Sequence, residues 1–108
     1  MPTYIDMKSA LARVGGNEIL YKKLLGKFEN SIDTKSLEEA VQAQDWLKAG
    51  EIVHAAKGIA GNLSLTAFYE QCVILMDQLR GGNAPNMADY AKFKQLLQET
   101  RAEINKVV

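Results

Sequence analysis

Several features that would assign a chain of this size to a particular class are missing from this sequence. Its 13 Lys and Arg balance its 13 Asp and Glu, so the basic excess of a typical nucleic-acid-binding domain is absent. No apolar run approaches the ~20 residues that cross a bilayer, and the first residues lack the basic and apolar parts of a secretory signal. A single cysteine, Cys72, cannot form an intramolecular disulfide, which fits a reducing compartment. We therefore expect a cytoplasmic protein that binds neither nucleic acid nor a membrane.

Proline is also scarce, and this leaves nearly the whole chain free to be helical. Only Pro2 and Pro85 occur in the 108 residues, a length that fits one domain over 1–108. Apolar residues recur at spacings of three and four, which predicts amphipathic helices over about 66–80 and 87–107. These residues are Leu65, Phe68, Cys72, Leu75 and Leu79, then Tyr90, Phe93, Leu97, Thr100, Ile104 and Val107. Between the two helices, 81–86 reads as a loop in which Asn86 caps the last helix.

The first half of the chain predicts further helices with a break between two of them. A short helix over about 6–14 ends at two glycines, and Asn17 caps the next helix. The apolar face of that helix, Leu20, Leu24, Phe28 and Ile32, changes phase downstream. We therefore expect a break near Ser31–Ser36, with Asp33 or Thr34 as a new cap.

A further helix over about 45–63, capped by Asp45, carries the only histidine. Its core face is expected to comprise Trp46, Ala49, Val53, Ala56, Ala60 and Leu63. No strand-like alternation appears anywhere in the chain. The predicted fold is therefore all-α, an antiparallel (up-down-up-down) four-helix bundle with a short extra N-terminal helix. No large apolar stripe is left over, so we expect a monomer.

Three glycines lie inside the histidine helix, although each lowers helix stability by about 1 kcal/mol relative to alanine. At 100° per residue they surround His54 beside the core face, together with one lysine. We call this set the histidine face; it consists of Gly50, His54, Lys57, Gly58 and Gly61. Leu47 and Ile59 are expected at its margins.

Two interpretations of the histidine face compete. Small residues let a neighbouring helix approach closely, in which case His54 is only a boundary residue. Alternatively, another protein brings a bulky reacting group to the imidazole. A neutral imidazole is a competent nucleophile at pH 7 because its ordinary pKa is about 6.5, and an ammonium three residues away can offset the charge of a phosphoryl group.

The sequence His54-Ala-Ala-Lys57-Gly58 resembles the signature of the histidine phosphotransfer (HPt) domains of phosphorelays. The resemblance extends to Gly15-Gly16-Asn17, Phe28, Asp45-Trp46 and Ala60-Gly61-Asn62-Leu63. It implies a four-helix bundle in which His54 accepts phosphate at Nε2 from a receiver-domain aspartate. It also implies that Lys57 stabilises the phosphoryl charge and that Gly58 gives access. The family commonly has glycine ten residues after the histidine, where this chain has Ser64.

The partners that this resemblance implies are response-regulator receiver domains, a hybrid sensor histidine kinase, or both. We expect no cofactor or metal of the chain's own, and Mg²⁺ on the partner receiver domain. The sequence has no Gly-rich phosphate loop, so it favours a phosphoryl carrier over an autonomous kinase. The alternative is a helical bundle that binds receivers without being phosphorylated.

Overall fold

The computed structural model describes residues 3–28 and 30–108; Met1, Pro2 and Glu29 lie outside the described residues. The described part of the chain forms six α-helices and one 3₁₀ helix, with no strand. In chain order these are α1 (Met7–Arg13), α2 (Glu18–Phe28), α3 (Thr34–Gln42), α4 (Trp46–Asn62), α5 (Thr66–Leu79), η1 (Arg80–Gly82) and α6 (Met87–Val107).

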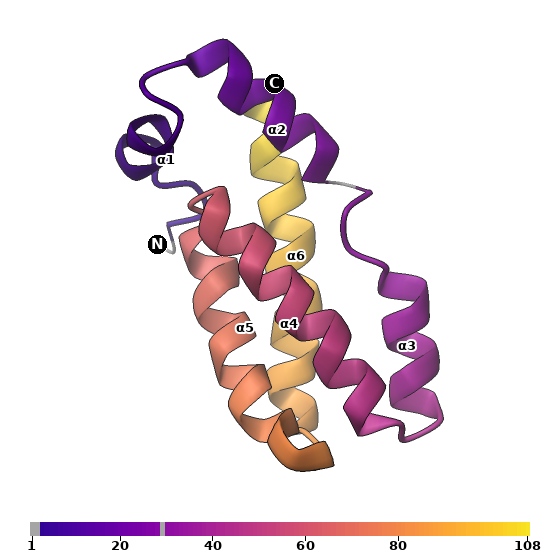
Figure 1. Cartoon of the computed structure of the whole chain (residues 1–108). Coiled ribbons are helices and arrows are strands. Elements are labelled where there is room, and N and C mark those ends of the chain that lie inside the picture. The colour runs from indigo at the N-terminus through magenta and orange to yellow at the C-terminus, as the bar shows by residue number, and fades with distance from the viewer. Residues whose placement is uncertain (1–2, 29) are drawn as a thin grey trace.

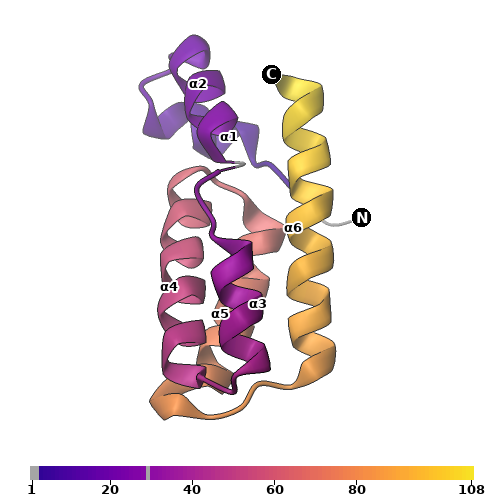
Figure 2. The same ribbon diagram turned by 90° about the vertical axis from the view of Figure 1, so that its right-hand side faces the viewer.

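Helices α3, α4, α5 and α6 lie side by side and alternate in direction, while α1 and α2 lie together at one end (Figure 1). Turning the molecule by 90° shows α6 standing along the bundle, with its C-terminal half reaching up beside α2 (Figure 2). The most extensive contact between two helices joins α4 and α5. The all-α, up-down-up-down bundle with an extra N-terminal helix is thus confirmed.

Side-chain caps start the helices where the sequence predicts them. Asn17 Oδ1 accepts a hydrogen bond from the Leu20 amide at 3.0 Å. Asp33 and Asp45 accept the equivalent bonds at the starts of α3 and α4, and Asn86 does so at the start of α6. Each of these caps satisfies backbone N–H groups that have no partner inside the helix. The predicted break is also present, because α2 ends at Phe28 and α3 begins only at Thr34.

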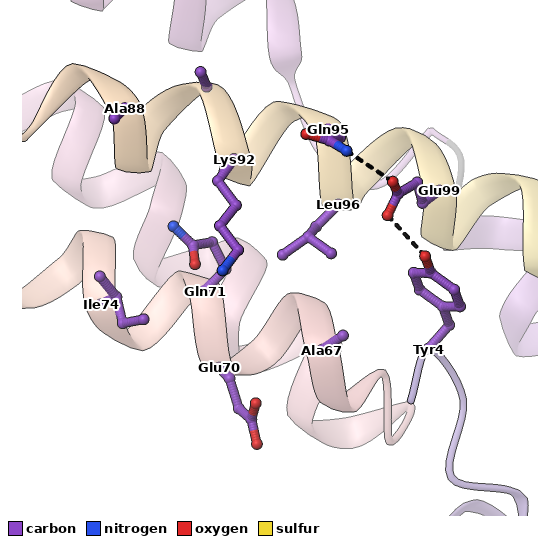
Figure 3. Close-up of a pocket in the computed structure, with 11 residues that line it drawn as sticks. Tyr4, Ala67, Glu70, Gln71, Ile74, Ala88, Lys92, Gln95, Leu96 and Glu99 are labelled. Carbon is purple, nitrogen blue, oxygen red and sulfur yellow. Dashed lines mark hydrogen bonds between the residues drawn. The ribbon is translucent and has the colours of Figure 1, made fainter. Parts of the chain in front are cut away.

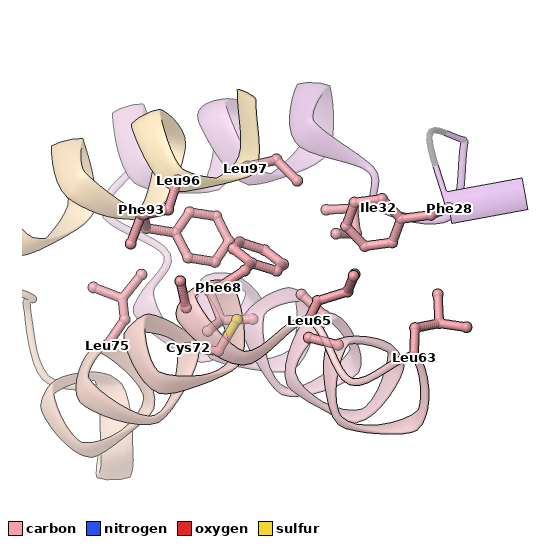
Figure 4. Close-up of a cluster of buried hydrophobic side chains, with 14 of the residues drawn as sticks. Phe28, Ile32, Leu63, Leu65, Phe68, Cys72, Leu75, Phe93, Leu96 and Leu97 are labelled. Atoms are coloured by element: carbon pink, nitrogen blue, oxygen red, sulfur yellow. The ribbon is translucent and has the colours of Figure 1, made fainter. Parts of the chain in front are cut away.

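The core lies between α4, α5 and α6 and is centred on aromatic rings (Figure 4). Phe68 packs edge-on against Phe28, with ring centroids 6.1 Å apart, and its ring lies 5.0 Å from that of Phe93. The predicted core faces of α5 and α6 are buried, except that Val107 is only half-buried. On α4 the predicted core residues are buried from Ala49 onward, and Trp46 is half-buried at the margin of the core.

The predicted core face of this segment is confirmed at Phe28 and Ile32, which are buried, but is wrong at Leu20. Leu20 is exposed and Leu24 half-buried, whereas Tyr21 and Leu25 are buried beside Phe28. The sequence pattern treats Ile32 as part of the same helix, but α2 ends before it. Because α2 packs on α1 and α6 at the end of the bundle, its buried face is set by those neighbours.

Candidate functional site

His54 lies midway along α4, on the side of the helix that faces solvent. The core face of α4 consists of Ala49, Val53, Ala56 and Ala60, which are at most 1% exposed. Because successive residues turn by 100° around the helix, burial of these four leaves His54 exposed next to the core face. The packing of the bundle therefore holds a nucleophilic side chain at a fixed place on the surface.

The three glycines of the histidine face differ in their surroundings. A Cβ placed on Gly58 would meet no other part of the molecule within 4 Å. A Cβ on Gly50 would lie 3.7 Å from Leu79 Cβ, and one on Gly61 would lie 3.4 Å from the Tyr69 ring. Leu79 and Tyr69 of α5 thus pack next to Gly50 and Gly61, at distances that a Cβ would meet as ordinary contact, which is in line with the packing interpretation. Gly58 leaves open space beside the imidazole, which packing alone does not explain.

Lys57 stands one turn after His54 and is half-buried. Burial raises the pKa of the Cys72 thiol to about 12, and the positive charge of Lys57 acts on that thiol in the opposite direction. The charge of Lys57 therefore acts across to Cys72 of α5. Side chains at i and i+3 are neighbours on a helix surface, so the ammonium is also placed to reach a group on His54.

The two apolar residues expected at the margins of the histidine face differ in exposure. Leu47 is 67% exposed, whereas Ile59 is half-buried and packs against the core. The sequence reasoning missed Tyr69, which is 37% exposed with its ring against Gly61. The sequence did offer a signal for Tyr69, because this large aromatic residue follows Phe68 and lies off the core face of α5.

Ser64 ends the histidine helix in the backbone conformation that favours glycine. Its φ is +56°, its amide donates to the Gly61 carbonyl at 3.3 Å, and the Leu65 amide donates to the Ala60 carbonyl at 2.9 Å. This is the Schellman arrangement, in which glycine is usual. The Ser64 side chain does not cap α5; its hydroxyl donates to Ser9 Oγ at 3.1 Å. The departure from the family pattern thus leaves the turn geometry intact.

A groove of about 770 Å³ lies away from His54, between α5 and α6 (Figure 3). At one end Tyr4 donates a hydrogen bond to Glu99 at 2.8 Å, and Gln95 donates to the same carboxylate at 3.0 Å. The groove contains none of the residues of the histidine face. This groove and the candidate nucleophile are therefore separate.

The model of the Hpt domain matches residues 24–103, about three quarters of the chain. The chain belongs to the Hpt domain family. Hpt domains have a phosphotransfer role in two-component signalling, interact with receiver domains and kinases, and are phosphocarriers rather than kinases.

The match covers the whole histidine face of this Hpt domain but not α1 or the start of α2. Comparisons with curated proteins and with solved structures give no match. Within the described residues, no helix has the length and apolar character needed to span a membrane.

Proposed function

We propose that this Hpt domain carries a phosphoryl group on His54, accepting it from and donating it to the aspartate of receiver domains. The observation that carries the proposal is the open space at Gly58 beside the exposed side chain of His54, the only histidine of the chain. In phosphoryl transfer the attacking atom and the leaving oxygen lie roughly in line with the phosphorus, so the two proteins must come into direct contact. An imidazole beside a glycine can be reached by an acidic pocket on another protein.

The transfer step balances without any further reactant. A ring nitrogen of neutral His54 attacks the phosphorus of the receiver's aspartyl phosphate. The phosphorus–nitrogen bond forms as the phosphorus–oxygen bond to the aspartate breaks, and the carboxylate leaves with the electron pair. The reverse step returns the phosphoryl group to an aspartate. The domain itself acts as a carrier with no kinase activity of its own.

Charge neutralisation is divided between the two proteins in this proposal. Lys57 stabilises the phosphoryl oxygens on His54, because an ammonium one helical turn away can approach them. Mg²⁺ bound to the receiver supplies the remaining positive charge during transfer. We also propose that the domain works as a monomer in the cytoplasm.

The test is phosphate transfer from a phosphorylated receiver domain to the wild type and to His54→Gln, with circular dichroism to check the fold. We expect label on the wild type alone, in a form that is labile to acid and stable to base, as a phosphohistidine is. A folded wild type that takes no label from several receivers would contradict the proposal. If it still bound those receivers, the domain would act by binding alone.

A further inference from the structure

Two exposed apolar side chains lie at the two ends of the histidine face. Leu47 precedes His54 by seven residues, and Gly61 follows it by seven. The ring of Tyr69 from α5 lies against Gly61. Seven residues are close to two helical turns, so Leu47 and Gly61 lie on the same side of α4 as His54, each about 10 Å from it along the axis. Leu47 is 67% and Tyr69 37% exposed. The nucleophile is therefore bracketed by apolar surface.

Each of these two side chains packs against a glycine. The Tyr69 ring atoms Cε2 and Cδ2 lie 3.4 and 3.5 Å from the place of a Cβ on Gly61. Leu47 Cδ2 lies 3.3 Å from the place of a Cβ on Gly82, in the turn η1 that follows α5. At 82 even an added Cβ would crowd Leu47, whereas at 61 a side chain longer than alanine would be needed to displace the Tyr69 ring. Glycine at each position therefore leaves room for the exposed group where it now lies.

Both apolar groups belong to the edge that the histidine face shares with α5. Gly50 borders the same helix, since a Cβ at this position would lie 3.7 Å from Leu79 Cβ. On the other side of α4, Ile52 and Ile59 are only half-exposed and pack against the core. Apolar surface that a partner can cover is thus concentrated on the α5 side of His54.

From this asymmetry we infer that Leu47 and Tyr69 are the contacts that align a receiver domain over His54, along the edge between α4 and α5. The inference rests on the proposed function, because transfer requires the receiver's aspartate to reach His54. A partner that buries ~800 Å² of this domain covers a patch roughly 30 Å across. Centred on His54, such a patch includes both apolar groups and removes them from water, which favours docking.

The experiment compares Leu47→Ala and Tyr69→Ala with Ile74→Ala. Ile74 is the matched control, because it is 43% exposed on α5 but lines the groove next to α6. Transfer from a phosphorylated receiver is measured over a range of receiver concentrations. At limiting receiver we expect about a tenfold loss of rate for each of the first two variants, as for an interface anchor. At saturating receiver the rate should stay within about twofold of the wild type, and Ile74→Ala should match the wild type throughout.

A small phosphate donor, phosphoramidate, separates docking from chemistry. It needs no docking surface, so His54 should accept phosphate from it equally in all four proteins. If the two variants take phosphate from the receiver as fast as the wild type, the inference is overturned while the proposed function stands. If the wild type itself takes none from receivers, the proposed function fails. In that case the affinity for unphosphorylated receiver is measured by calorimetric titration. If both variants bind the receiver as tightly as the wild type does, the docking role is overturned.

A double-mutant cycle tests the role of Gly61 as a positioning residue. Gly61→Leu displaces the Tyr69 ring, so it should slow transfer at limiting receiver in the wild type. In the Tyr69→Ala background it should add nothing, because the group it displaces is gone. Fully additive losses would show that Gly61 contacts the partner directly, and would overturn this role.

Discussion

At the scale of single residues, the three glycines around His54 have separate roles. Gly50 and Gly61 lie where Leu79 and Tyr69 of α5 approach, whereas Gly58 faces open space. A glycine with no packing neighbour destabilises its helix, and no tertiary contact in the folded state offsets this loss. Gly58 is therefore the glycine whose presence is best explained by the approach of another protein.

A large side chain at position 58 should separate folding from transfer. We expect Gly58→Leu to fold and to be as stable as the wild type or more so, by up to about 1 kcal/mol, since leucine favours a helix. Transfer from a receiver should fall about 100-fold, because the side chain holds the two reacting atoms apart. Gly26→Leu is the matched control, since Gly26 is also helical, exposed and without neighbours within 4 Å. Equal transfer rates in the two variants would contradict the access role of Gly58.

Removing the charge of Lys57 should affect the phosphorylated state. We expect Lys57→Ala to slow transfer or to shorten the lifetime of the phosphohistidine by about three- to tenfold, which corresponds to at most about 1.4 kcal/mol. Lys48→Ala is the control, because Lys48 is an exposed lysine of the same helix outside the histidine face. Rates of label gain and loss are measured for both, and matching values would exclude a specific role of Lys57.

At the scale of the elements, three helices end in the same way. The residue after the C-cap has a positive φ at Gly15, Gln44 and Ser64, with values of 64°, 56° and 56°. In each case the next amide bonds back to a carbonyl five residues earlier, at 2.7, 2.8 and 2.9 Å. The first of the three uses glycine, while the other two hold an L side chain in a conformation unfavourable by about 1–2 kcal/mol.

Gln44→Gly should therefore stabilise the domain. Gln44 is exposed and its φ is positive, so relief of the strained backbone outweighs the added freedom of the unfolded chain. We expect a gain of about 0.5–1 kcal/mol in the free energy of unfolding, measured as a higher urea midpoint with an unchanged slope. Ser64→Gly should gain less, since it loses the hydroxyl bond to Ser9. A lower midpoint for Gln44→Gly would contradict this account.

At the scale of the whole molecule, one buried hydrogen bond joins the end of the bundle to α2. The Tyr21 hydroxyl donates to the Leu63 carbonyl at 2.6 Å. Burial, and next the charge of Asp6, raise the pKa of Tyr21 to about 12. The pKa of the buried Cys72 thiol is also raised, to about 12, mainly by burial. Both groups are held in their neutral forms by the fold.

Stability should consequently fall in alkali. The unfolded chain releases these protons near pH 9 and 10, whereas the folded chain keeps them to about pH 12. The stabilisation is fully present below pH 9 and is lost as the pH rises from there toward 12. Urea unfolding at pH 8, 9.5 and 10.5 measures this loss. At pH 8 the free energy of unfolding of Tyr21→Phe should be about 1 kcal/mol lower than that of the wild type. It should then decrease less as the pH rises. Parallel losses in the two proteins would refute the contribution of Tyr21.

The comparison of α2 with α5 shows why local pattern predicted some faces and not others. On α5 an apolar repeat without interruption matched the buried face from Leu65 to Leu79. On α2 the repeat ran past the end of the helix, and either of two adjacent apolar sets could have been buried. The choice of Tyr21 and Leu25 over Leu20 and Leu24 depended on contact with α1 and α6.

The sequence by itself determined the all-α fold, the caps at Asn17, Asp33, Asp45 and Asn86, and the placing of His54 beside the core face. These depend on spacings of three and four residues and on bonds between near neighbours, which the local sequence specifies. Three features were decided only by the tertiary structure. Gly58 faces open space, the Tyr69 ring lies against Gly61, and Leu47 packs against Gly82. These contacts join residues brought together only when α4 and α5 pack, and the distance between two helices cannot be read from either one.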